Sequence, residues 1–199
     1  MKKVLTILIL SIFIAIGCTL SGVVNAATGY EGMVVYRNGV SGGSWGSIEW
    51  HAGLMDEASF SSMGPIVHIG GPGQIVRYAE LSEFNDGNTF MGIYNKSSLT
   101  STNRDDIKTV GRRLVSENIS YTFFNMIEHT ATGTWIYATD ITKLRCDGVV
   151  EFAYEYNGFQ LQSFGSSWDV SKVSDAGAHN AATTSPRRQS WQLTKYADN

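Results

Sequence analysis

Residues 145–156 read RCDGVVEFAYEY, and Asn157-Gly158 follows them as a helix stop signal. Within this stretch Cys146, Val149, Val150 and Ala153 recur at i, i+3, i+4 and i+7. This spacing predicts a helix that buries one face and points Cys146 toward the body of the protein. The same periodicity places the acidic residues Asp147, Glu151 and Glu155 on another face, which we expect to be solvated.

The chain before this helix shows the alternation of β-strands. Candidate strands are 33–36, 47–55, 66–69, 74–79 and 89–94. Turn signals separate them at 70–73 (GGPG) and 85–88 (NDGN).

Helical patterns cover 104–117 and 121–128, with Thr102 or Asn103 as a cap for the first, whereas the residues after 158 look irregular. We find no repeat and no second domain. The pattern predicts one α+β domain in which an antiparallel sheet packs against helices.

Composition limits the class of protein. Hydrophobic residues make up 43% and charged residues 17% of the 199 residues, as expected of a folded core, and the net charge of −3 argues against a nucleic-acid binder. No spacing of Cys and His suggests a structural zinc site, so we expect no metal and no cofactor. His129 and His179 stand in polar surroundings and are expected at the surface.

The first residues have the form of a signal peptide. Lys2-Lys3 precede an apolar run over 4–16, which is shorter than the about 20 residues that span a bilayer core. Val24-Asn25-Ala26 suits a signal peptidase, so we expect a signal peptide over 1–26, no permanent transmembrane helix and a single domain over 27–199. Cys18 follows Ala15-Ile16-Gly17, which partly matches a lipobox, and lipid anchoring through Cys18 is the alternative. Both readings predict a secreted or envelope-associated protein.

Cys146 is the one cysteine outside the leader. Free N–H groups and the helix dipole at the first turn favour an anion, so the position predicts a lowered thiol pKa and a nucleophilic thiolate. The alternative is a small buried core cysteine.

His51 and His68 fall in consecutive predicted strands, seventeen residues apart. In an antiparallel hairpin both rings would project from one face, about 5 to 8 Å apart. A cysteine nucleophile needs a base, and the base needs a partner that fixes its tautomer. Cys146, His51 and His68 can supply these parts, although each histidine alone could be structural.

Three segments carry a resemblance to a known family: WHAGL (50–54), IVH (66–68) and RCDGVVEFAY (145–154). They resemble the motifs of NlpC-type papain-like cysteine peptidases. The order His, His, Cys is similar to that of the circularly permuted branch, which includes YiiX/YaeF-like amidases and, more distantly, lecithin retinol acyltransferases. The resemblance covers about residues 45–160 and implies a permuted papain-like fold.

The resemblance implies that Cys146 is the nucleophile, His51 the general base and His68 the orienting residue. It also implies that Tyr121 lies near the oxyanion site, although Tyr121 could instead pack against Phe123 and Phe124. Two features depart from the family pattern: Arg145 and Asp147 flank the cysteine, and His-Ala-Gly replaces His-Val-Gly.

The sequence therefore predicts an exported cysteine hydrolase that cleaves amide bonds through an acyl-enzyme, with peptidoglycan stem peptides as the first substrate class. Three alternatives stay open. The chain could act on acyl-lipid amides or esters, or it could be an inactive papain-like module that binds wall peptides or a protein. It could also be an unrelated β-rich binding module.

Overall fold

The computed structural model describes residues 29–39, 50–162 and 168–198. The predicted signal peptide, with Cys18, and most of the glycine-rich segment before β2 lie outside the described residues.

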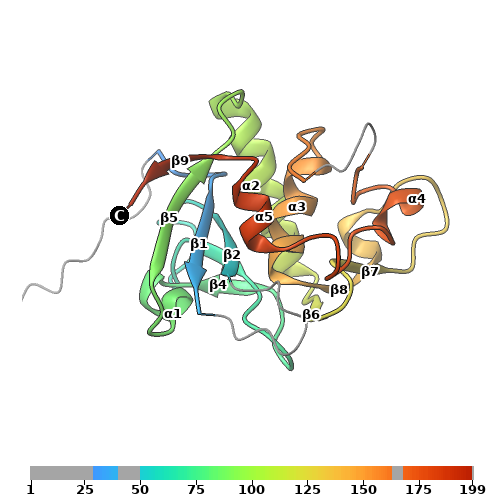
Figure 1. The fold of residues 1–199 in the computed structure, drawn as a ribbon, viewed down its shortest axis with the longest axis horizontal. Coiled ribbons are helices and arrows are strands. Elements are labelled where there is room, and N and C mark those ends of the chain that lie inside the picture. Colours follow the sequence, from blue (N-terminus) through green and yellow to red (C-terminus); the bar gives the residue numbers. More distant parts are fainter. Residues whose placement is uncertain (1–28, 40–49, 163–167, 199) are drawn as a thin grey trace, which may run out of the picture.

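The architecture is α+β, with a larger antiparallel sheet and a smaller mixed one (Figure 1). The larger sheet has the order β4-β3-β2-β1-β5-β9. Its strands are β1 (Val34–Asn38), β2 (Trp50–Met55), β3 (Ile66–His68), β4 (Arg77–Ala79), β5 (Phe90–Asn95) and β9 (Thr194–Ala197). The smaller sheet has the order β6-β8-β7, formed by β6 (Ser120–Tyr121), β7 (Ile127–His129) and β8 (Ile141–Leu144).

The two principal helices are α2 (Ser101–Ser116) and α3 (Cys146–Glu155), both close to their predicted positions. The helix α2 begins one turn earlier than expected, because Thr100 forms a capping box with Asn103. The shorter helices are α1 (Leu81–Asn85), the 3-10 turn η1 (Ala138–Asp140), α4 (Val173–Ala176) and α5 (Pro186–Ser190). In Figure 1, α2, α3 and α5 stand between the larger sheet and the strands of the smaller one.

Strand β2 separates two cores. Its residues Ala52 and Leu54 belong to the large core with Val149 and Val150 of α3. Met55 points to the opposite face of the strand and belongs to a smaller core around Phe84 of α1. His51 lies on the same face as Met55, and its ring contacts that of Phe84.

Helix α3 is buried along its entire length, which corrects the expectation of a solvated acidic face. Asp147, Glu151 and Glu155 are at most 3% exposed. Arg145, fully buried, donates from Nε and Nη2 to the Asp147 carboxylate at 2.6 and 2.7 Å, and from Nη2 to Thr184 Oγ1 at 2.6 Å. Residues after 158, predicted to be irregular, cover this face of α3.

Three further predictions from the sequence are wrong. Residues 121–128 do not form a helix, because β6 and β7 instead pair with β8, one on each side of it. The segment after 158 holds α4, α5 and β9, and β9 pairs with β5. His179 is fully buried, and His129 is half-buried.

The start of α3 lies close to the loop before β7. The carbonyl of Met126 accepts the N–H of Arg145 at 3.0 Å, and a Cβ at Gly148 would lie 2.4 Å from that oxygen. Glycine at 148 therefore allows the approach that positions the first turn of α3. Within the described residues, no helix is long and apolar enough to cross a membrane.

We expect Asp147→Asn to destabilise the fold by about 3–5 kcal/mol, because it leaves the Arg145 guanidinium buried without a counter-charge. Urea unfolding measures the change. The control is Arg113→Gln, which breaks the surface ion pair with Glu117 and should lower the free energy of unfolding by less than about 1 kcal/mol. Equal costs for the two variants would contradict a structural role for the buried pair.

Candidate active site

The structure brings the two predicted histidines together. Nε2 of His51 lies 2.9 Å from Nδ1 of His68, and both side chains are buried. The ring centroids are 5.2 Å apart, with the rings nearly perpendicular. Phe84 lies against both rings, at centroid distances of 5.2 and 5.6 Å. Strand pairing and the Phe84 ring thus hold His51 in one orientation.

Cys146 lies beside the strand that carries His51. It is the first residue of α3, and its sulfur lies near the backbone N–H groups of Ala52 and Asp147, which favour a thiolate. Strand β3 pairs with β2 at Leu54 and Met55, so Ala52 lies beyond the last pair of that ladder. The sulfur therefore lies next to the backbone of the residue that follows His51.

No hydrogen bond joins the Cys146 sulfur to either imidazole among the residues the structure describes. The hydrogen bond between the histidines uses Nε2 of His51, which leaves Nδ1 as the ring nitrogen that can face a thiol. Catalytic hydrogen bonds in ligand-free enzymes are often long, and they tighten when substrate binds.

Burial dominates the protonation of the thiol. Burial and the Asp147 carboxylate raise the pKa of Cys146 to about 12, although the N–H groups of Ala52 and Asp147 and the charge of Arg145 lower it. The expectation of a lowered thiol pKa is therefore wrong, since desolvation outweighs the helix terminus. The resting group at neutral pH is the thiol.

Both histidines are neutral for the same reason. Burial, then His68 and Arg37, lower the pKa of His51 well below its usual value. Burial, then Arg77 and Arg37, lower the pKa of His68 to about 3. A neutral His51 can accept a proton at Nδ1 when its Nε2–H donates to Nδ1 of His68. His68 Nε2 is buried, and within the described part of the chain it has no hydrogen-bond partner.

Tyr121 lies within electrostatic range of the cysteine. It is half-buried in β6, beside Leu144 of β8. Burial, and then the Cys146 thiolate, raise the pKa of Tyr121, so its hydroxyl stays protonated and can donate a hydrogen bond.

Arg37 is a site residue that the sequence analysis missed. It faces His51 across the β1–β2 ladder, is 8% exposed, and its Nε has no hydrogen-bond partner among the described residues. Its guanidinium pairs with Asp86 at 4.0 Å, is attracted more weakly to a Cys146 thiolate, and lowers the pKa of both histidines. An arginine at the end of a buried apolar strand was the signal available in the sequence.

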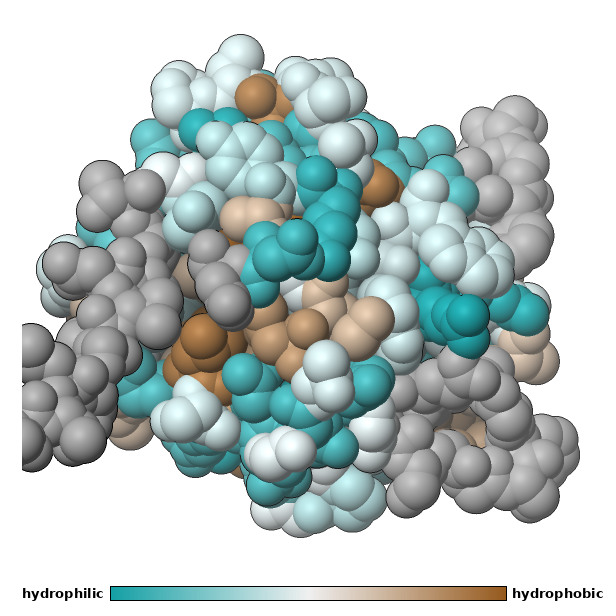
Figure 2. Space-filling model, turned by 60° about the vertical axis from the view of Figure 1, so that its left-hand side comes forward, coloured by the Kyte–Doolittle hydropathy of each residue, from teal (hydrophilic) through white to brown (hydrophobic). Residues whose placement is uncertain are grey.

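A cavity of about 420 Å³ lies elsewhere, between α2, η1 and the end of α3. It is lined by Thr109, Val110, Arg113, Tyr137, Ala138, Thr139, Phe152 and Tyr156. None of the predicted site residues is among them. On the face shown in Figure 2, the broadest brown apolar area lies near the centre, and smaller brown areas lie at the top and at the upper right.

Comparison of the chain with protein-family models, with curated proteins and with solved structures gives no match.

The histidine pair should make the fold acid-sensitive. The folded pKa of His68, about 3, lies below its unfolded value of about 6.5, so its contribution to stability is complete above pH 6.5 and is lost as the pH falls. Below pH 6.5 we expect the free energy of unfolding to fall less steeply with decreasing pH for His68→Gln than for the wild type. The two slopes should differ by up to about 1.4 kcal/mol per pH unit. Urea unfolding between pH 4.5 and 7.5 measures the slope. Parallel profiles for variant and wild type would contradict a neutral buried His68.

Alkylation reports the state of the thiol. In a Cys18→Ser chain, where Cys146 is the sole thiol, we expect slow reaction with iodoacetamide at pH 7. The rate should rise up to about pH 10 without levelling off, because a raised pKa disfavours the thiolate. The urea-unfolded chain is the control and should follow an ordinary thiol pKa of about 8.5. A plateau below pH 8 in the native protein would instead indicate a preformed thiolate–imidazolium pair.

Proposed function

We propose that this chain is an exported cysteine hydrolase of the circularly permuted NlpC-type papain-like class, which cleaves amide bonds through an acyl-enzyme. One observation carries the proposal: the 2.9 Å contact from His51 Nε2 to His68 Nδ1, which gives His51 the partner that a general base needs. The His51 ring lies on the Phe84 face of β2, and Cys146 lies in the large core on the other face. The mechanism therefore requires the imidazole and the sulfur to approach each other when substrate binds.

The mechanism begins from a neutral thiol and a neutral imidazole. Nδ1 of His51 takes the thiol proton as the sulfur of Cys146 attacks the amide carbonyl carbon. Because the thiol pKa is raised, this proton transfer accompanies the attack and does not precede it. His68 holds the imidazole and stabilises the imidazolium that forms.

The carbonyl oxygen then carries negative charge, which free N–H groups at the start of α3 and the Tyr121 hydroxyl can stabilise. The His51 imidazolium returns its proton to the amine nitrogen, the C–N bond breaks, and a thioester remains on Cys146. Water, deprotonated by His51, attacks the thioester and releases the carboxylic acid and the thiol.

Peptidoglycan stem peptides are the substrate class we favour. They offer amide bonds outside the cell and carry free carboxylates. Arg37 pairs with Asp86 at 4.0 Å, and its Nε has no partner among the described residues, so the guanidinium can attract a substrate carboxylate. Acyl-lipid amides and esters are the second class to test.

The direct test is digestion of muropeptides and of an N-acyl amide, with the products identified by mass spectrometry. We expect the wild-type protein to cleave an amide in the muropeptides and Cys146→Ala to leave it intact. Muropeptides that stay intact while the acyl amide is cleaved would move the assignment to lipid substrates. If neither substrate changes, the hydrolase assignment is wrong and a binding module remains.

The two histidines should differ in effect. His51→Ala removes the base and the leaving-group acid, so we expect kcat to fall about 10²–10⁴-fold, toward the level of Cys146→Ala. His68→Ala loosens only the orientation of His51 and should retain measurable activity, with more retained in His68→Gln, whose amide oxygen can accept the Nε2–H. Steady-state rates for the four variants decide the roles. A His68→Ala variant as inactive as Cys146→Ala, with substantial activity in His51→Ala, would reverse the assignment.

A further inference from the structure

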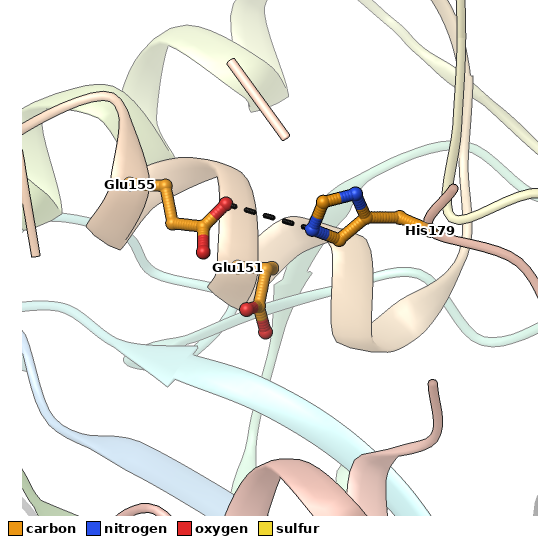
Figure 3. Close-up of side chains that lie close together, drawn as sticks. All are labelled: Glu151, Glu155 and His179. Carbon is orange, nitrogen blue, oxygen red and sulfur yellow. Dashed lines mark ion pairs between the residues drawn. The ribbon is translucent and has the colours of Figure 1, made fainter. Parts of the chain in front are cut away.

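A second cluster of titratable side chains lies on α3, apart from the proposed active site. Glu151 and Glu155, one helical turn apart, face His179, which follows α4 (Figure 3). One potential ligand atom from each of the three residues lies within 4.8 Å of the others, and all three side chains are buried. Among the described residues this is the one such grouping of three or more His, Cys, Asp or Glu side chains.

His179 is held in the form that binds a metal. Its Nδ1 lies 3.0 Å from the carbonyl oxygen of Asp175, and the ring lies against Trp168 at a centroid distance of 4.4 Å. Donation from Nδ1–H to that carbonyl leaves the lone pair on Nε2. Nε2 points toward Glu155 Oε2 at 3.8 Å, beyond hydrogen-bond distance, and no other described residue bonds it. A buried, unpartnered nitrogen is thus aimed into the acidic pair.

Outer hydrogen bonds orient the carboxylates. Glu151 accepts the backbone N–H of Gln162 at 2.6 Å and the Nε2–H of Gln189 at 2.5 Å. The Tyr36 hydroxyl in turn donates to Oε1 of Gln189 at 3.0 Å and fixes the orientation of this amide. Glu155 accepts the backbone N–H of Val170 at 2.5 Å with one oxygen, and its carboxyl group lies within hydrogen-bonding reach of that of Glu151. Backbone and amide donors that position first-sphere ligands are typical of metal sites.

Among the residues that the structure describes, no lysine or arginine forms an ion pair with Glu151 or Glu155. The buried guanidinium of Arg145 is engaged by Asp147. The other groups that act on the cluster, Asp147, Asp169 and Asp175, are acidic as well. Burial raises the pKa of both glutamates, and their mutual repulsion adds to this for Glu155. Two buried carboxylates need either a proton between them or a cation.

We propose that Glu151, Glu155 and His179 form a structural site for a divalent transition-metal ion, for which Zn²⁺ is the probe. A divalent ion neutralises the two carboxylates, and mixed oxygen and imidazole donors suit Zn²⁺. With metal–ligand bonds of about 2.0–2.2 Å, the side chains need to close by about 1 Å. The ion would join α3 to the segment after 168, and this role does not depend on the proposed hydrolase activity.

The test uses the full chain with Cys146→Ala, because Cys146, His51 and His68 are themselves zinc-binding residue types. After treatment with a chelator, we expect calorimetry to show one Zn²⁺ bound per chain, and Zn²⁺ to raise the Tm. Glu151→Gln, Glu155→Gln and His179→Gln should each weaken Zn²⁺ binding at least about tenfold. The matched control is Glu128→Gln, a glutamate paired with Lys143 in the smaller sheet, which should bind Zn²⁺ like the parent.

Two results would overturn the proposal. The first is absence of Zn²⁺ binding, or equal affinity in the parent and the three variants. The second is a Glu155→Gln variant that is more stable than its parent, together with a parent that binds no Zn²⁺. This result would indicate that the two carboxyl groups share a proton and hold no metal. If the variants do not fold, Co²⁺ added to the parent chain decides. Paramagnetic shifts of the His179 ring protons in the NMR spectrum support the site, and unshifted protons exclude it.

Discussion

Helix α3 brings three carboxylates into the protein interior, and much of the structure serves to accommodate them. Asp147 forms an ion pair with Arg145, which also donates to Thr184. Glu151 accepts hydrogen bonds from Gln162 and Gln189, and Glu155 accepts one from the backbone of Val170. Apart from Arg145, these partners lie in the chain after α3, so burial of α3 and folding of that segment depend on each other.

This arrangement explains how the candidate nucleophile is positioned. The ion pair of Arg145 and Asp147 flanks Cys146 and fixes both sides of the first turn of α3. The approach of Gly148 to Met126 and the N–H of Ala52 on the sulfur then hold the turn against β2. The two residues that depart from the family pattern are thus a buried structural pair. They account for local rigidity, and they also deepen the burial that keeps the thiol protonated.

The sequence predicted what depends on local periodicity. The alternation over 50–55 and the helical spacing over 145–156 led to β2 and α3, and the pairing of predicted strands led to the neighbouring rings of His51 and His68. Each of these follows from repeats of two or 3.6 residues along one segment.

Local sequence patterns do not predict environments that distant segments create. A charged helix face is normally solvated, so Glu151 and Glu155 were expected at the surface, yet Gln162 and Gln189, from a segment without clear periodicity, cover and bond them. The lowered thiol pKa was a helix-terminus argument, and tertiary burial reverses it. The segment 121–128 has no helix because its residues pair with β8 as strands β6 and β7. In each case the missing information was the partner, which no local pattern contains.

The central claim is that the sulfur of Cys146 attacks a carbonyl, and intact-mass spectrometry of acid-quenched reactions tests it directly. The protein is mixed with muropeptides or an activated acyl ester and quenched within the first turnovers. We expect a mass increase equal to the acyl group, located on Cys146 after digestion and absent in Cys146→Ala. Where an activated ester acylates His51→Ala, we expect the adduct to persist, because the base that activates water is missing. Hydrolysis by Cys146→Ala at the wild-type rate, without an adduct in either protein, would contradict it.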